Sequence, residues 1–179
     1  IMLEECGLAY NTIPVAIGRG DQFAPEFIRI SPNNRIPAIV DQETGISVFE
    51  GGAILIYLAE KAGMLFPDAL RERYEVLQWL FWQAGGLGPM AGQISHFVNY
   101  APRDGNEYSR ERYANEYNRC IGVLERRPVA APVRILDMGC GNGHLIAFLH
   151  NQLGLLRPDL AVEIMRLFRE INARGTTVV

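Results

Sequence analysis

The residues in this chain with the clearest capacity for chemistry lie around Pro37 and Glu50. Ile36-Pro37 leads into an apolar stretch that predicts a strand, where a cis X-Pro bond is tolerated, and a cis bond would turn the N–H and C=O of Ile36 outward. Free backbone groups of this kind pair with an extended peptide as if it were an added strand. An ordinary trans proline at a strand entry is the alternative.

Glu50-Gly51 stands where a helix is expected to begin. The free N–H groups and positive dipole end of a helix start attract a carboxylate, and the Glu50 carboxylate would offset an ammonium group on the same ligand. Glu50 could instead only favour the helix start electrostatically. Both interpretations stay open on sequence alone.

A glycine-rich turn is a second stretch of possible chemistry. Gly139, Gly141 and Gly143 follow the apolar run 133–137 and precede another apolar run. In this strand–turn–helix order, glycines allow the backbone to approach a nucleotide-containing cofactor closely.

Metal and disulfide chemistry are not indicated. His96 has no Cys, Asp or Glu at metal-ligand spacing, so we expect a structural histidine and no metal site. Cys6, Cys120 and Cys140 form no CxxC pair and are too few for a disulfide framework. This usage favours a reducing compartment, the cytoplasm.

Composition excludes several classes of function. The chain has 179 residues, 49% hydrophobic and 21% charged, enough for one or two small domains with a core. Seventeen basic and twenty acidic residues give a net charge of −3 without a basic cluster, which argues against nucleic acid and anionic lipid as partners. No apolar run of about 18 residues indicates a membrane span. A small-molecule ligand is expected.

The expected elements form an α/β segment, a helical segment and a second α/β segment. Apolar spacing puts Ile54, Leu55, Leu58 and Ala62 on one helix face. The expected ranges are a helix end at 1–6, a strand at 12–17, a short helix at 26–30, a hairpin of strands at 38–41 and 46–49, helices at 51–62, 69–83 and 108–127, and a glycine-broken stretch at 85–92.

The order strand, helix, two antiparallel strands and helix is similar to the C-terminal part of a thioredoxin-like domain. Within it, residues 31–61, reading SPNNRIPAIVDQETGISVFEGGAILIYLAEK, resemble the ligand-binding part of the glutathione transferase family. The stretches GDQFAPEFIRISPNN, VLQWLFWQAGGLGPMAGQISHF and ERY at 111–113 resemble its bacterial nu-class branch, whose members resemble both glutathione transferases and disulfide-bond reductases. This resemblance covers residues 1–127.

The resemblance implies glutathione as the substrate and a homodimer as the assembly. In the family, the proline that matches Pro37 is cis, and the residue that matches Gly51 is usually a serine whose hydroxyl binds the glutamyl carboxylate. The stretch 85–92 resembles the segment that lines the second-substrate pocket and the dimer seam. The implied glutathione-binding residues are Gln22, Arg35, Ile36, Pro37, Glu50, Gly51 and Arg112.

Two shorter resemblances follow Arg127. Residues 133–154 resemble the first motif of class I methyltransferases, which implies S-adenosylmethionine binding at Asp137, Gly139, Gly141 and Gly143. A complete domain of that kind needs roughly 150 residues. Residues 155–179 resemble a segment of transporter-type ATPases, but no phosphate-binding loop precedes them, so a structural helix is expected there.

The predicted fold is α/β plus α. It comprises an incomplete thioredoxin-like domain over 1–63 that lacks its first strand, a partial all-helical domain over 69–127 and an appended α/β segment over 133–179. Without the first strand, the strands at 12–17 and 38–41 lose a common partner. A permuted replacement by the strand at 133–137 is one alternative.

The main functional hypothesis is a glutathione-binding protein, either transferase-like or a glutathione-dependent disulfide reductase. We expect impaired activity, because the turn that carries the family's catalytic hydroxyl has no counterpart in this chain, and the catalytic residue is therefore unassigned. The alternatives are a fragment of an S-adenosylmethionine-dependent methyltransferase and a non-catalytic dimerising or interaction module.

Overall fold

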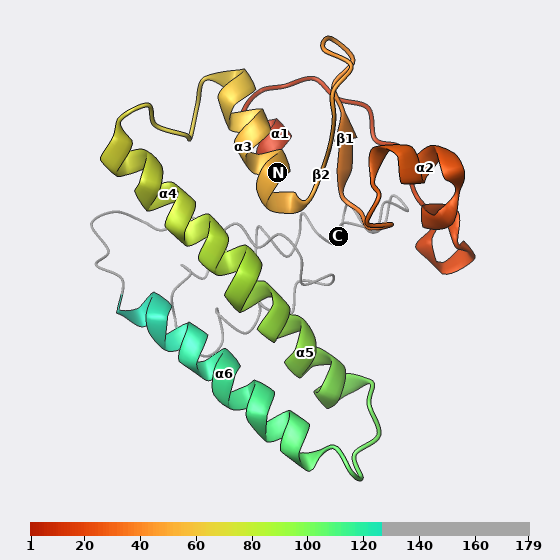
Figure 1. Cartoon of the computed structure of the whole chain (residues 1–179), viewed down its shortest axis with the longest axis vertical. Helices are drawn as coiled ribbons and strands as arrows, with labels where there is room; N and C mark the ends of the chain where they lie inside the picture. The colour runs from red at the N-terminus through yellow and green to blue at the C-terminus, as the bar shows by residue number, and fades with distance from the viewer. Residues whose placement is uncertain (127–179) are drawn as a thin grey trace. The chain divides into compact units, whose positions relative to one another are not determined.

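The computed structural model describes residues 1–126, which form two compact units (Figure 1). The division falls between Leu80 and Phe81, inside helix α4 (Leu70–Trp82). Every expectation for residues 127–179, including the glycine turn at 137–143 and the replacement strand at 133–137, lies outside the described residues.

The first unit contains the expected helices and hairpin. Pro25 occupies the first turn of α2, where its missing N–H costs nothing, and Gly63 ends α3 in the left-handed conformation, with a φ of 62°. The elements are α1 (Met2–Glu5), 3₁₀ turns at Ile17–Arg19 and Asp21–Phe23, α2 (Pro25–Ile30), β1 (Ala38–Val40), β2 (Ser47–Phe49) and α3 (Gly51–Ala62).

The strand expected at 12–17 does not form, and that prediction was wrong. Residues 11–16 have no regular structure, Ile17 begins a 3₁₀ turn, and Ile13 is 82% exposed. Among the described residues the only sheet has two strands, β1 and β2, so no strand lies beside this segment. An apolar stretch becomes a strand only where a neighbour accepts and donates its backbone hydrogen bonds.

The hairpin predicted from the sequence is confirmed. β1 and β2 are antiparallel, and Ala38, Ile39 and Val40 pair with Phe49, Val48 and Ser47 respectively. The N–H of Asp41 donates to the carbonyl of Ile46 at 2.9 Å and closes the turn. Helix α3 follows β2 directly and buries Ile54, Leu58 and Ala59, while Leu55 and Ala62 of the predicted face are only half-buried.

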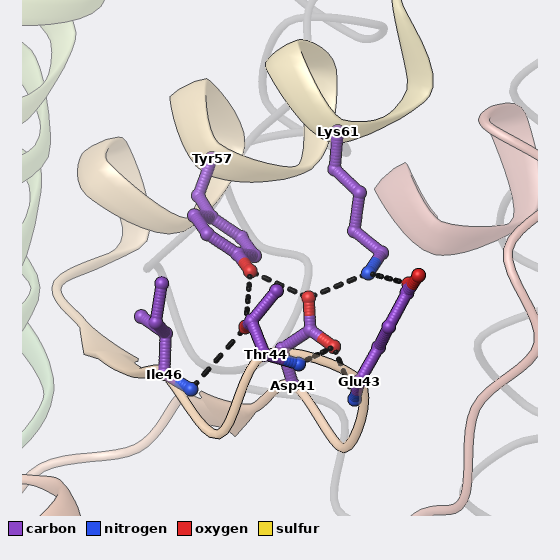
Figure 2. Close-up of polar contacts among 6 residues, drawn as sticks. All are labelled: Asp41, Glu43, Thr44, Ile46, Tyr57 and Lys61. Carbon is purple, nitrogen blue, oxygen red and sulfur yellow. Dashed lines mark hydrogen bonds and ion pairs between the residues drawn. The ribbon is translucent and has the colours of Figure 1, made fainter.

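The turn of the hairpin is tied to α3 by the carboxylate of Asp41 (Figure 2). Its Oδ2 accepts from Lys61 Nζ at 2.6 Å and from the hydroxyl of Tyr57, and its Oδ1 accepts from the N–H of Glu43 at 2.9 Å. Lys61 Nζ also contacts Glu43 Oε2 at 2.8 Å. The Asp41 side chain is only 8% exposed, so this junction is better shielded than a typical surface ion pair.

The second unit is helical. After the π-helical segment Gln83–Leu87 come α5 (Gly88–Asn99) and α6 (Glu107–Glu125), and the two helices pack around Leu87, Ala91 and Cys120. Within residues 1–126, no helix combines the length and the apolarity required to cross a bilayer.

The glycine-rich stretch at 85–92 does not break the helix as predicted. The chain stays helical and widens to a π-helix over Gln83–Leu87 before α5 begins. A Cβ at Gly88 would lie 3.1 Å from the carbonyl oxygen of Gln83, so glycine allows this turn to close. The glycines therefore alter the helical pitch where a stop was expected.

Asp41→Asn should reduce the stability of the fold at neutral pH and should also reduce the loss of stability that acid causes. Lys61, followed by Tyr57, holds the pKa of the Asp41 carboxyl well below its usual range. In the unfolded chain the Asp carboxyl has a pKa of about 3.9 and so binds a proton at a higher pH than in the folded chain. The ionised Asp41 carboxylate therefore stabilises the folded state fully above that pH, and this stabilisation is lost as the pH falls further. We expect a lower thermal unfolding midpoint at pH 7 and a smaller decrease between pH 7 and pH 3.

The matched control is Asp68→Asn, which removes an exposed carboxylate that has no hydrogen bond or ion pair among residues 1–126. It should leave both midpoints nearly unchanged. Equal acid sensitivity of the wild type and Asp41→Asn would show that the junction does not stabilise the fold.

Candidate functional site

The register of the hairpin brings two sequence-predicted segments to one end of the first unit. Because Ala38 pairs with Phe49, the residues just outside this pair, Pro37 and Glu50, lie at the same end of the two strands. Helix α3 begins at Gly51, immediately after Glu50. Two short strands and a helix start thus juxtapose Ile36-Pro37 with Glu50-Gly51.

The peptide bond between Ile36 and Pro37 is cis, as the family resemblance implied. Ile36 is half-buried, and neither its N–H nor its C=O has a hydrogen-bond partner among the described residues. One donor and one acceptor of the main chain are therefore available to an extended ligand.

The loop before Ile36 is fixed by Ser31, which the sequence predictions did not assign. Ser31 is fully buried, and its hydroxyl donates to the carbonyl of Arg35 at 2.8 Å. The N–H of Asn34, which has a φ of 54°, donates to the carbonyl of Ser31 at 2.9 Å. A serine in a Ser-Pro-Asn-Asn run is the available sequence signal, because short polar side chains bond nearby backbone in turns.

Glu50 has an uncommon backbone conformation and a fixed side chain. Its φ is 69°, in the region that disfavours side chains and that occurs at functional sites more often than elsewhere. Asn33 Nδ2 donates to Glu50 Oε1 at 2.9 Å, and the Glu50 side chain makes no hydrogen bond to the helix start. Glu50 therefore forms no side-chain cap, while a purely electrostatic contribution to the helix start requires no such bond and stays the alternative.

The start of α3 keeps free backbone donors. The first intrahelical bond runs from the N–H of Ile54 to the carbonyl of Glu50 at 2.9 Å, so the N–H groups of Gly51, Gly52 and Ala53 precede it without an intrahelical acceptor. These donors and the helix dipole favour a negatively charged group. Glu50 and the helix start together suit a ligand end that carries both a carboxylate and an ammonium group.

The remaining predicted site residues are more dispersed. Gln22 is half-buried in a 3₁₀ turn, and its Oε1 is buried without a hydrogen-bond partner among residues 1–126. Arg35 is exposed on the loop before Ile36. Arg112 lies on α6, in the second unit, and its role stays a prediction. Asp137, Gly139, Gly141 and Gly143 fall outside the described residues.

Metal binding and thiol chemistry find little support in the described part of the chain. Residues 1–126 contain no group of three His, Cys, Asp or Glu side chains able to hold a metal. His96 contacts the ring of Phe97 edge-on, with a centroid separation of 5.2 Å. Cys120 is fully buried, and this burial raises the pKa of its thiol, so it serves as a core residue.

The described residues define a class of fold: a thioredoxin-like unit in which a cis-proline before a strand and a helix start lie at one end, followed by a helical unit. The family model of the glutathione S-transferase N-terminal domain matches residues 1–60. The chain is 52% identical over 151 residues to the disulfide-bond oxidoreductase YfcG of Escherichia coli (strain K12), a match that covers 78% of this chain and 70% of YfcG.

Two further proteins extend the comparison. The disulfide-bond oxidoreductase YghU of Escherichia coli (strain K12) is 41% identical over 135 residues, 71% of this chain and 46% of YghU. A glutathione transferase from Burkholderia graminis, crystallised with two glutathione molecules per subunit, is 46% identical with a TM-score of 0.66, covering 70% of this chain and 55% of that one. The chain therefore belongs to the glutathione transferase family, as the sequence predicted, and spans about half of the length of YghU.

Proposed function

We propose that this chain binds glutathione at the end of the first unit where Ile36-Pro37 meets Glu50 and the start of α3. The observation that carries the proposal is the pairing of Ala38 with Phe49, which brings these segments together. Glutathione is a tripeptide with a free carboxylate and an ammonium group at its glutamyl end, and the site offers a partner for each feature.

Each part of the ligand has a matching group. The unpaired N–H and C=O of Ile36 suit the peptide-like middle. The free N–H groups of α3 suit the glutamyl carboxylate, and the Glu50 carboxylate suits the ammonium group. Gln22 and Arg35 add amide and guanidinium N–H groups, which donate hydrogen bonds to carboxylates. The role of Arg112 in the second unit stays a prediction.

We further propose that the reaction is glutathione-dependent reduction of disulfides. The names of YfcG and YghU support this choice over conjugation to an electrophile. One glutathione thiolate attacks the disulfide and releases a thiol, and a second attacks the glutathionyl sulfur of the mixed disulfide to give oxidised glutathione and the second thiol. The two glutathione molecules per subunit in the Burkholderia graminis protein match this stoichiometry. No described residue is assigned to thiolate stabilisation.

The assembly and compartment follow from other residues. Leu70, Tyr74 and Phe81 lie at helical spacing on one face of α4 and are 73%, 63% and 69% exposed, which supports a homodimer through this face.

Cys6 and Cys120 are free thiols, which fits the cytoplasm, where glutathione itself is kept reduced. The relatives do not favour a methyltransferase fragment or a non-catalytic module.

Calorimetric titration of glutathione against the wild type, Glu50→Gln and Gly51→Ser tests the binding site. Gly51→Ser restores a hydroxyl at the helix start and adds one charge-assisted hydrogen bond, so the affinity should rise by roughly tenfold. Glu50→Gln removes the charge opposite the ammonium group at an exposed position and should weaken binding by up to about fivefold. S-adenosylmethionine should give no saturable heat. Unchanged dissociation constants in both folded variants would place the ligand elsewhere.

Turnover distinguishes the two glutathione-dependent reactions. With glutathione, a small dialkyl disulfide and a coupled assay for oxidised glutathione, we expect one oxidised glutathione per disulfide reduced. An aryl halide electrophile should be conjugated with a much lower kcat/KM, because YfcG and YghU are both named as disulfide-bond oxidoreductases. Conjugation that equals or exceeds disulfide reduction would contradict the proposed reaction class.

The dimer is tested by sedimentation velocity over a range of protein concentrations. Leu70→Glu combined with Tyr74→Glu places charges in the apolar face of α4 and should convert the dimer to a monomer. Glu72→Lys changes a charge on the opposite face of α4 and should leave the dimer intact. A monomeric wild type, or a double variant that remains dimeric, would refute the interface.

A further inference from the structure

Asn33 contacts Glu50 at the proposed site. Its Nδ2 donates to Glu50 Oε1 at 2.9 Å, from the loop before β1 to the residue before α3. The direction of this bond is fixed by chemistry, because a carboxylate only accepts. Both side chains are exposed, so the contact lies where a ligand can reach it.

The surroundings hold both partners in place. The loop of Asn33 is anchored by Ser31, which is fully buried and bonds the carbonyl of Arg35 at 2.8 Å. Glu50 is held with a φ of 69° between β2 and α3. An exposed contact between two flexible side chains would carry little weight, but here the backbone on each side is fixed by other contacts.

The bond leaves one carboxylate oxygen of Glu50 without a partner. Oε1 accepts from Asn33, while Oε2 has no hydrogen bond or ion pair among residues 1–126. The Glu50 side chain also makes no bond to the start of α3. The carboxylate is thus oriented before any ligand arrives and keeps one oxygen for a cationic group.

We infer that Asn33 is a positioning residue that presents Glu50 to the amino group of a γ-glutamyl ligand, and so sets the preference for ligands that carry this amino group. The inference rests on the proposed glutathione site and deepens it. A preoriented carboxylate loses less side-chain entropy when it binds an ammonium group, and this smaller loss increases the affinity. Asn33 itself needs no contact with the ligand.

The test compares glutathione with glutaryl-cysteinyl-glycine, the same tripeptide without the α-amino group. Calorimetry on the full chain should show that the wild type prefers glutathione. Asn33→Ala should weaken glutathione binding by roughly three- to tenfold, the range of one net hydrogen bond. It should leave the affinity for the analogue unchanged, because that ligand has no ammonium group to meet. Asn99→Ala removes another exposed amide, which donates to Ser95 Oγ, and should alter neither affinity.

Each other outcome rejects a specific statement. Equal loss of both ligands in Asn33→Ala would show that Asn33 only supports the loop, and no loss of either would show that the contact is not used. A wild type with equal affinity for the two ligands overturns the inference even if Asn33→Ala does not fold, while glutathione binding itself stands. A wild type that binds neither ligand overturns both the inference and the proposed function.

Discussion

The carboxylate of Asp41 accepts hydrogen bonds from Lys61, Tyr57 and the backbone of its own turn, and through them the hairpin and α3 are held as one piece. The two strands are only three residues long, and an isolated hairpin of this size is marginal in water. Helix α3 supplies both the apolar cover, through Ile54 and Leu58, and the polar attachment of the turn. The arrangement of the hairpin against α3 depends on this junction.

The junction lies at the far end of the hairpin from the proposed site. β1 runs from Pro37 toward Asp41, and β2 returns toward Glu50, after which α3 runs back past Asp41 with Tyr57 and Lys61 (Figure 2). Fixing the far end of α3 to the turn therefore determines where its first residues lie relative to Pro37. The stabilising junction and the proposed binding site thus lie at opposite ends of the same helix.

Local patterns predicted much of this arrangement. The hairpin, α2, α3 and α6 follow from turn residues and apolar spacing. The cis bond before Pro37 was expected only from the family resemblance, and the role of Glu50 in binding stays a prediction. The sequence could not predict the absence of a strand at 12–17, because strand formation depends on a neighbour that is distant in the chain. It also missed the π-helix at Gln83–Leu87, where glycine signals both a helix break and a change in pitch. The contact between Asn33 and Glu50 joins residues 17 positions apart, a separation that no local pattern records.

The proposed site relies on the main chain more than on side chains, and this would allow it to accommodate Gly51. The groups of Ile36 and the first N–H groups of α3 are backbone atoms, so their positions depend on register and on helix geometry, which a change from serine to glycine leaves in place. What such a change removes is one side-chain hydrogen bond. Discrimination among ligands then falls more heavily on the remaining side-chain contact at the helix start, the Glu50 carboxylate. Because Asn33 donates a hydrogen bond to that carboxylate, the inferred preference for ligands with an amino group depends on the loop before β1 as well as on the helix start.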